Sequence, residues 1–212
     1  MKRNSPVTFA ILAVIIVVYM FEVLAGGSSS VQVLVDLGAI VPGLLSRGEW
    51  WRLVAAMFLH IGILHLFLNL WALYQLGGVF EMLFGSRRFA VTYFVSGIVA
   101  SLTSAIFIAS NGVAAGASGA IFGVLGALIV SIRRSPRFRH AAWTRGLLQQ
   151  LILWAGINII IGFMPGIDNA AHIGGFACGL LLGLAPHRIP PPPPSEVLVE
   201  SSAYEPPRRE AP

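Results

Sequence analysis

Four polar side chains stand out within otherwise apolar stretches of this sequence: His65, Asn69, Ser118 and His172. A serine hydroxyl beside a neutral histidine is an activated nucleophile. Imidazole and amide N–H groups can stabilise the oxyanion that forms when such a nucleophile attacks a carbonyl carbon. These residue types are therefore the parts of a serine hydrolase, provided that the fold brings them together.

The composition indicates a membrane protein. Of the 212 residues, 11% are charged, whereas ordinary globular domains contain about 25% charged residues. Hydrophobic residues make up 56% of the chain. Because so few charges cannot cover the surface of a soluble domain of this size, we predict an integral membrane protein. Polar groups at membrane depth are costly, so each of the four side chains is a candidate for function.

The chain carries a net charge of +5, but its basic residues form short clusters between apolar stretches. This distribution is typical of membrane proteins with positively charged cytoplasmic loops. It leaves no basic face for nucleic acid, and we expect no nucleic-acid partner. The single Cys178 excludes a disulfide within the chain.

Uncharged stretches define the expected helices, since a membrane span needs about 20 residues. The longest stretch, residues 89–132, is long enough for two helices joined by a small-residue turn at 110–117. The first stretch resembles a signal peptide, but Glu22 follows before any clear cleavage site, so we expect it to be retained. The sequence predicts an all-α polytopic bundle with six transmembrane helices, near residues 7–25, 62–83, 89–109, 118–132, 147–164 and 169–186.

The basic residues also predict the orientation. Counted as far as Arg188, ten of them fall on the side of the two termini, and only Arg47 and Arg52 fall on the opposite side. Both termini are therefore expected in the cytoplasm. Residues 26–61 are too polar to span and should lie at the outer interface. We expect a core over residues 1–188, a disordered proline-rich cytoplasmic tail over 189–212, and, from the arginine-rich short loops, a bacterial inner membrane.

Three of the four polar residues should lie at a similar depth. Ser118 is about 22 Å from Arg133 along its helix, at 1.5 Å per residue. His172 and His65 are each roughly 24 Å from the inner ends of their helices. The helix that begins at Ser118 is short, so irregular backbone precedes it below the outer surface. Such backbone is tolerated only inside protein or beside water, which predicts a water-filled pocket open to the outside.

Glycines predict which helices touch. Two glycines spaced by four residues follow Ser118, and three more with the same spacing follow His172: Gly119 and Gly123, then Gly175, Gly179 and Gly183. Such stripes allow helix backbones to approach closely in lipid. If the stripes face each other, Ser118 and His172 come within reach.

Each residue taken alone also has an ordinary explanation. A membrane serine usually bonds to its own helix, and a membrane histidine often serves packing or a proton path. His60 is expected to be a hydrogen-bonding residue of the loop or interface, and Asp168 to mark the outer end of a helix. Glu81 is expected to pair with Arg87 or Arg88 at the inner face. Two interpretations of Phe122 stay open, packing on His172 and an ordinary core position, and Glu22 has no assigned role.

The motifs resemble those of the rhomboid intramembrane serine proteases. The resemblance covers roughly residues 5–186 and rests on the order and spacing of EWWR at 49–52, HIGILHLFLN at 60–69, LGGVFE at 76–81, GASG at 116–119 and AHIGGFACG at 171–179. It implies a six-helix core with Ser118 as nucleophile and His172 as general base, acting as a dyad. It also implies an oxyanion hole formed by His65, Asn69 and the Ser118 backbone N–H, and a structural role for Trp51 and Arg52.

The sequence thus predicts an intramembrane serine endopeptidase that uses no metal or cofactor. We expect it to cut single-span membrane proteins near the extracytoplasmic end of their transmembrane helices, where helix-breaking residues expose a carbonyl. Two other functions remain open. One is a non-catalytic rhomboid-like protein that binds membrane helices. The other is a small transporter or proton channel that uses His65, Asn69 and His172 as a polar path.

Overall fold

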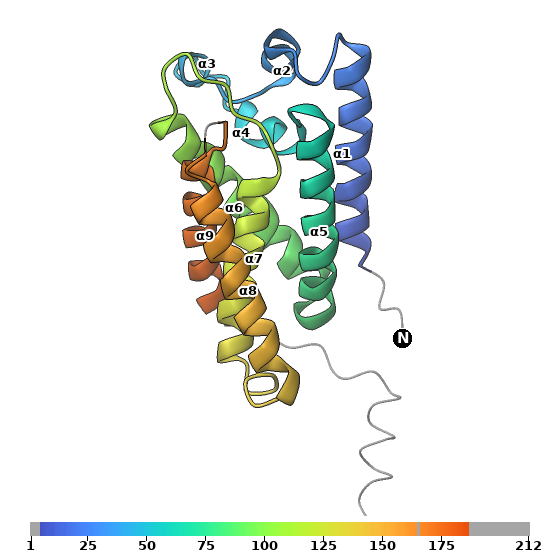
Figure 1. The fold of residues 1–212 in the computed structure, drawn as a ribbon, viewed down its shortest axis with the longest axis vertical. Coiled ribbons are helices and arrows are strands. Elements are labelled where there is room, and N and C mark those ends of the chain that lie inside the picture. Colours follow the sequence, from blue (N-terminus) through green and yellow to red (C-terminus); the bar gives the residue numbers. More distant parts are fainter. Residues whose placement is uncertain (1–4, 165, 187–212) are drawn as a thin grey trace, which may run out of the picture.

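The computed structural model describes residues 5–164 and 166–186. Its described part is built from helices that run alternately up and down (Figure 1). Six long helices are α1 (Pro6–Leu24), α5 (Gly62–Phe84), α6 (Ser86–Phe107), α7 (Ser118–Arg134), α8 (Ala142–Ile161) and α9 (Asn169–Leu184). Between α1 and α5 lie four short helices: α2 (Val31–Leu37), α3 (Pro42–Leu45), α4 (Arg52–Ala55) and the 3-10 helix η1 (Ala56–Phe58).

The long helices confirm the predicted positions, with one clear shift. The helix predicted from residue 147 begins at Ala142 instead, and Arg145 lies exposed within its first turn. A charge ends an apolar stretch but does not end a helix, because an exposed arginine can point into water from a regular turn. The proline-rich tail predicted for residues 189–212 lies outside the described residues.

Four of the long helices, α1, α5, α6 and α8, are long and apolar enough to cross a membrane. Many large apolar side chains on their outer faces are exposed, including Phe67 on α5 and Ile160 on α8. Contiguous apolar surface of this kind is suited to lipid rather than to water. The protein is therefore a helical membrane bundle. The shorter helices α7 and α9 have 17 and 16 residues, and for these two the predicted span stays a prediction.

Helix α7 is the centre of the bundle, and almost every residue in it is buried. Glycine allows α9 to pack against it backbone to backbone. A Cβ atom at Gly175 would collide with the carbonyl oxygen of Gly119, and one at Gly179 would collide with that of Gly123. The facing glycine stripes predicted from the sequence are confirmed.

Two buried carboxylates connect α1 to its neighbours. One joins α1 to α5, the second long helix, and the other joins α1 to the segment that precedes α5. Where α1 begins, Glu81 accepts hydrogen bonds from the backbone N–H groups of Val7 and Thr8, at 3.3 and 2.6 Å. Where α1 ends, Glu22 accepts one from the backbone N–H of His60 at 3.0 Å. The expected ion pair between Glu81 and Arg87 or Arg88 is wrong, because the Glu81 carboxylate turns inward to neutral donors on α1.

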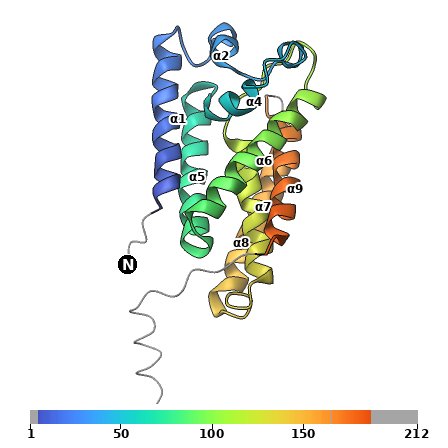
Figure 2. The ribbon, with the colours of Figure 1, turned by 180° about the vertical axis from the view of Figure 1, so that it is seen from behind.

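The short helices gather at the end of the bundle where α1 ends and α5 begins (Figures 1 and 2). Arg52 holds this region together. Its guanidinium pairs with Glu49 at 2.6 Å and donates to the carbonyl oxygens of Val35 and Ala39 at 2.6 and 3.1 Å. The buried arginine therefore fixes the outer loop against the bundle, as the resemblance implies for this motif.

Candidate active site

Ser118 and His172 meet across α7 and α9. The Nε2 atom of His172 lies 2.9 Å from the Oγ atom of Ser118. Ser118 is the first residue of α7, and His172 is in the first turn of α9. The imidazole is 8% exposed. The close approach follows from the adjacent glycine packing, where Gly119, directly after Ser118, and Gly175, one turn after His172, leave no side chain between the two helices.

The backbone before Ser118 is held from the outer loop. Ile40 and Ala114 form an isolated antiparallel bridge, with N–H···O distances of 2.8 and 3.1 Å. The N–H of Gly116 donates to the carbonyl oxygen of Ala56 at 2.9 Å. Gly116 has a φ of +136°, which side-chain-bearing residues rarely adopt. These contacts satisfy the irregular backbone and start α7 below the level at which α1 ends and α5 begins (Figure 1).

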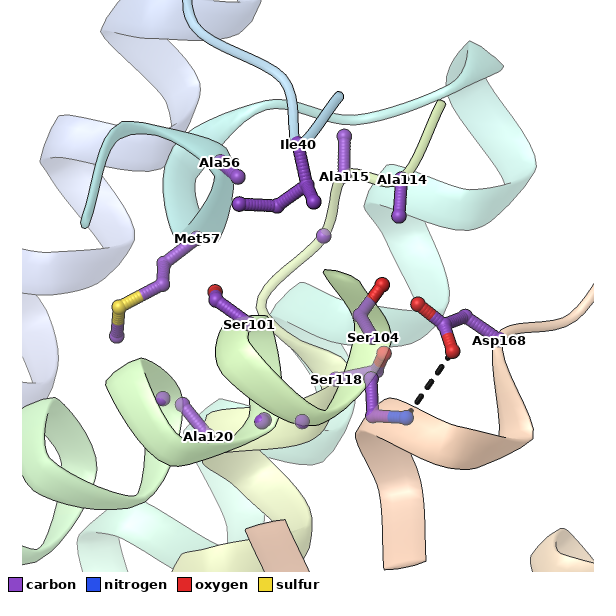
Figure 3. Close-up of a pocket in the computed structure, with 15 residues that line it drawn as sticks. Ile40, Ala56, Met57, Ser101, Ser104, Ala114, Ala115, Ser118, Ala120 and Asp168 are labelled. Carbon is purple, nitrogen blue, oxygen red and sulfur yellow. Dashed lines mark hydrogen bonds between the residues drawn. The ribbon is translucent and has the colours of Figure 1, made fainter. Parts of the chain in front are cut away.

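The start of α9 is fixed by a different residue. The Asp168 side chain caps the helix by accepting a hydrogen bond from the backbone N–H of Ala171 at 3.0 Å (Figure 3). This confirms that Asp168 marks the helix end. Within the described part of the chain, Nδ1 of His172 has no hydrogen-bond partner. The imidazole is steadied instead by Phe122, whose ring stacks on it at 4.3 Å with an interplanar angle of 12°.

His65 and Asn69 lie on α5 and face the same cavity as Ser118. A Cβ atom placed on Gly116 would lie 2.9 Å from Nε2 of His65 and 3.8 Å from Oγ of Ser118. A small space therefore separates the imidazole from the hydroxyl, and only glycine leaves it open. Asn69 directs its amide to its own helix, donating to the His65 carbonyl oxygen at 2.9 Å. An amide carries two N–H groups, so one of them remains for another acceptor.

The cavity beside these residues has a volume of about 820 Å³. It is lined mostly by apolar residues of α5, the 107–122 segment and the 166–172 segment, and all four candidate residues are part of the lining. A second, small cavity of about 30 Å³ lies behind Ser118 (Figure 3). Ser101, Ser104 and Asp168 also line it. A space of this size and polarity can hold a water molecule.

Sequence reasoning missed Ser101 and Ser104, which lie three residues apart on α6 and line the small cavity. His60 lies in a loop and hydrogen-bonds to Glu22 and Phe58, as expected, but it is also fully buried. Burial, with a smaller effect from the nearby His65, lowers the pKa of His60 to about 3. The partner of Glu22 could not be inferred from spacing, because 38 residues separate it from His60.

Comparison with known proteins identifies the family of this chain. A model of the Rhomboid domain matches residues 47–189. The chain is 40% identical over 187 residues to rhomboid protease GluP of Bacillus subtilis, covering 86% of this chain and 36% of that protein. It is 39% identical over 155 residues to RHOMBOID-like protein 5 of Arabidopsis thaliana, covering 73% and 50%. Inactive RHOMBOID-like protein 8 of the same plant is 37% identical over 134 residues, covering 63% and 37%.

The chain thus spans between about a third and a half of the length of these relatives. Their names include a protease and an inactive protein. Whether a chain of this kind is active must therefore be argued from its own residues, and Ser118 and His172 are the pair on which that argument depends.

Proposed function

Because the chain belongs to the rhomboid family, we propose that it is an intramembrane serine endopeptidase with Ser118 as nucleophile and His172 as general base. The observation that carries the proposal is the 2.9 Å approach of His172 Nε2 to Ser118 Oγ in the lining of a large cavity. A serine that only satisfied its own helix would need no such partner from a second helix.

The reaction proceeds in two halves. As Ser118 Oγ attacks the substrate carbonyl carbon, its proton passes to His172 Nε2 and the carbonyl oxygen becomes an oxyanion. The C–N bond then breaks, and the same proton passes to the leaving amine. A water molecule attacks the acyl-enzyme and gives a proton to His172, which returns it to Ser118 Oγ as the carboxylic acid leaves.

The oxyanion is stabilised by groups that surround the start of α7. The first N–H groups of a helix lack partners within the helix and point toward the attacking serine. His65 and the second amide N–H of Asn69 add donors from α5. Removal of one such donor from an oxyanion hole typically lowers kcat by roughly 10²–10³. The open space at Gly116 supports this assignment, since it lies between His65 and Ser118.

The substrate we propose is the transmembrane helix of a single-span membrane protein. A helix hides its carbonyl groups in its own hydrogen bonds, so the segment to be cut must unwind, and small or helix-breaking residues favour this. The apolar walls of the large cavity suit such a segment. Entry is proposed between α5 and α8, where the rings of Trp71 and Trp154 contact each other at 4.9 Å and would have to separate.

The orientation and location follow as proposals from the charges. With both termini in the cytoplasm, Ser118 lies toward the extracytoplasmic side, and the cut falls near that end of the substrate helix. The arginine-rich inner loop at 133–145 supports this orientation. We propose the inner membrane of a bacterium as the site of action.

The test is cleavage of a model single-span substrate by the purified protein in detergent. The wild type should cut, and both Ser118→Ala and His172→Ala should lose cutting while remaining folded. Cys178→Ala serves as a matched control on α9 and should cut like the wild type. If Ser118→Ala cuts as fast as the wild type, the proposed mechanism is wrong.

A further inference from the structure

The outer end of α1 is tied to the segment that leads into α5 by one buried hydrogen bond. The backbone N–H of His60 donates to Oε1 of Glu22 at 3.0 Å, and both residues are fully buried. The other oxygen, Oε2, has no hydrogen-bond partner among the described residues. Since a backbone N–H can only donate, Glu22 serves this segment as an acceptor.

The next residue of that segment acts on the candidate oxyanion donor. The backbone N–H of Ile61 donates to Nδ1 of His65 at 3.3 Å. The Nδ1 atom must therefore accept, and a neutral His65 carries its proton on Nε2. The Nε2 atom and the adjacent Cε1 are the His65 atoms nearest to a Cβ position on Gly116, at 2.9 and 2.7 Å, and the Ser118 Oγ atom lies 3.8 Å from the same position.

His60 has the opposite tautomer for a similar reason. Its Nδ1 atom lies 3.2 Å from the carbonyl oxygen of Phe58, which can only accept, so the proton is on Nδ1. The rings of His60 and His65 are 5.3 Å apart. The buried ring of His60 thus packs beside His65, while the two successive N–H groups, of His60 and Ile61, are bound by Glu22 and by His65.

We propose that Glu22 is a positioning residue for the oxyanion-stabilising imidazole of His65. By holding the backbone of His60, Glu22 holds the N–H of Ile61 against Nδ1 of His65 and keeps the His65 proton on Nε2, directed at the oxyanion. The expected effect of Glu22 on catalysis rests on the proposed function. The tautomer of His65 does not depend on that function.

The chain offers a matched control at the other end of the same pair of helices. Glu81 is also a buried carboxylate that accepts N–H groups on α1. It lies 16 residues beyond His65 on α5, or about 24 Å at 1.5 Å per residue. Loss of Glu81 should therefore loosen the α1–α5 contact without changing His65.

The experiment compares Glu22→Met, which removes the acceptor at similar length, with Glu22→Gln, which keeps an acceptor oxygen, and with Glu81→Met. Histidine labelled with ¹⁵N reports which ring nitrogen of His65 carries the proton, with His65→Ala used to assign the signal. We expect the proton on Nε2 in the wild type, Glu22→Gln and Glu81→Met. In Glu22→Met we expect a mixture of both tautomers, together with a roughly 10-fold lower kcat and an unchanged KM.

A double-mutant cycle separates positioning from general damage. If Glu22 acts through His65, Glu22→Met should lower kcat in the wild type but not further in His65→Ala. An equal loss in both backgrounds would overturn the proposal, and so would a His65 that keeps its proton on Nε2 in Glu22→Met. If Glu22→Met fails to fold, the wild-type protein still tests the proposal. A His65 proton on Nδ1 rather than on Nε2 would overturn the proposal in that case. If Ser118→Ala still cuts, the proposed function fails, whereas the tautomer measurement stands by itself.

Discussion

The Nε2 atom of His172 lies 2.9 Å from Oγ of Ser118, although 54 residues separate the two in the chain. The short distance depends on the contact between α7 and α9, where glycines replace side chains at the crossing. Because no side chain spaces the helices, the first turn of α9 is brought against the first residue of α7. The chemistry of the site therefore depends on packing further down the same helix pair.

Substitution of Gly179 by alanine should separate these helices. A Cβ atom there meets the carbonyl group of Gly123, which is backbone and cannot turn aside. We expect a loss of about 1–3 kcal/mol in the free energy of unfolding, the usual cost of overpacking a core, and a fall in kcat. Gly156→Ala on α8 is the control, because nothing lies within 4 Å of a Cβ atom at that position. Equal stability of Gly179→Ala and Gly156→Ala, measured by thermal unfolding in detergent, would contradict the close packing.

Removal of the cap at Asp168 should disturb the position of His172 indirectly, through the start of α9. Asp168→Ala leaves the N–H of Ala171 without its side-chain acceptor, and loss of such a cap costs about 0.5–2 kcal/mol. Asp168→Asn retains an acceptor oxygen and should keep most of the stability. Thermal unfolding and the cleavage rate, measured on both variants, test this. If Asp168→Asn loses as much activity as Asp168→Ala, then the charge of Asp168 matters rather than the cap.

The burial of His60 predicts a specific dependence of stability on pH. Its pKa is about 3 in the folded protein, against an ordinary value of 6.5. Below pH 6.5 the unfolded chain binds a proton that the folded protein does not, so stability falls as the pH falls toward 3. Between pH 7.5 and pH 5 the contribution of this one group is a loss of about 2 kcal/mol.

His60→Asn removes this titration and should show a correspondingly flatter profile of unfolding free energy against pH. The difference between the two profiles isolates His60, because the other groups titrate in both proteins. Parallel profiles for the wild type and His60→Asn would contradict this prediction, because they would show that the pKa of His60 is the same in the folded and unfolded states.

Much of the site could be predicted from the sequence because its signals are local. Ser118 and His172 each precede a run of glycines at four-residue spacing, and that spacing marks a helix face made for close contact. The position of Asp168 at a helix end followed from the loop signal MPGID, and the structure adds that its side chain caps the helix. Packing of Phe122 on His172 was one of two interpretations of its position one turn after Ser118, and the structure shows the two rings stacked. The approach of Ser118 and His172 is confirmed by their 2.9 Å contact.

What could not be predicted depends on side chains that have more than one available partner. Glu81 stands six residues before Arg87, so an ion pair was the simplest expectation, but donors on α1 lie closer in space. One N–H of the Asn69 amide bonds to the carbonyl oxygen of His65 on its own helix, a contact that the spacing did not indicate. Spacing along the chain gives the face of a helix, but it does not give the rotamer or the partner across the bundle.

Active-site labelling is the most direct test of the dyad. The purified protein would be treated with a fluorophosphonate, and the modified residue identified by mass spectrometry in wild type, His172→Ala and Asp168→Asn. We predict modification at Ser118 in the wild type and in Asp168→Asn, and a loss of about 100-fold or more in the rate for His172→Ala, since the serine then lacks its base. Modification at another serine, or labelling of Ser118 at the wild-type rate without His172, would contradict the account.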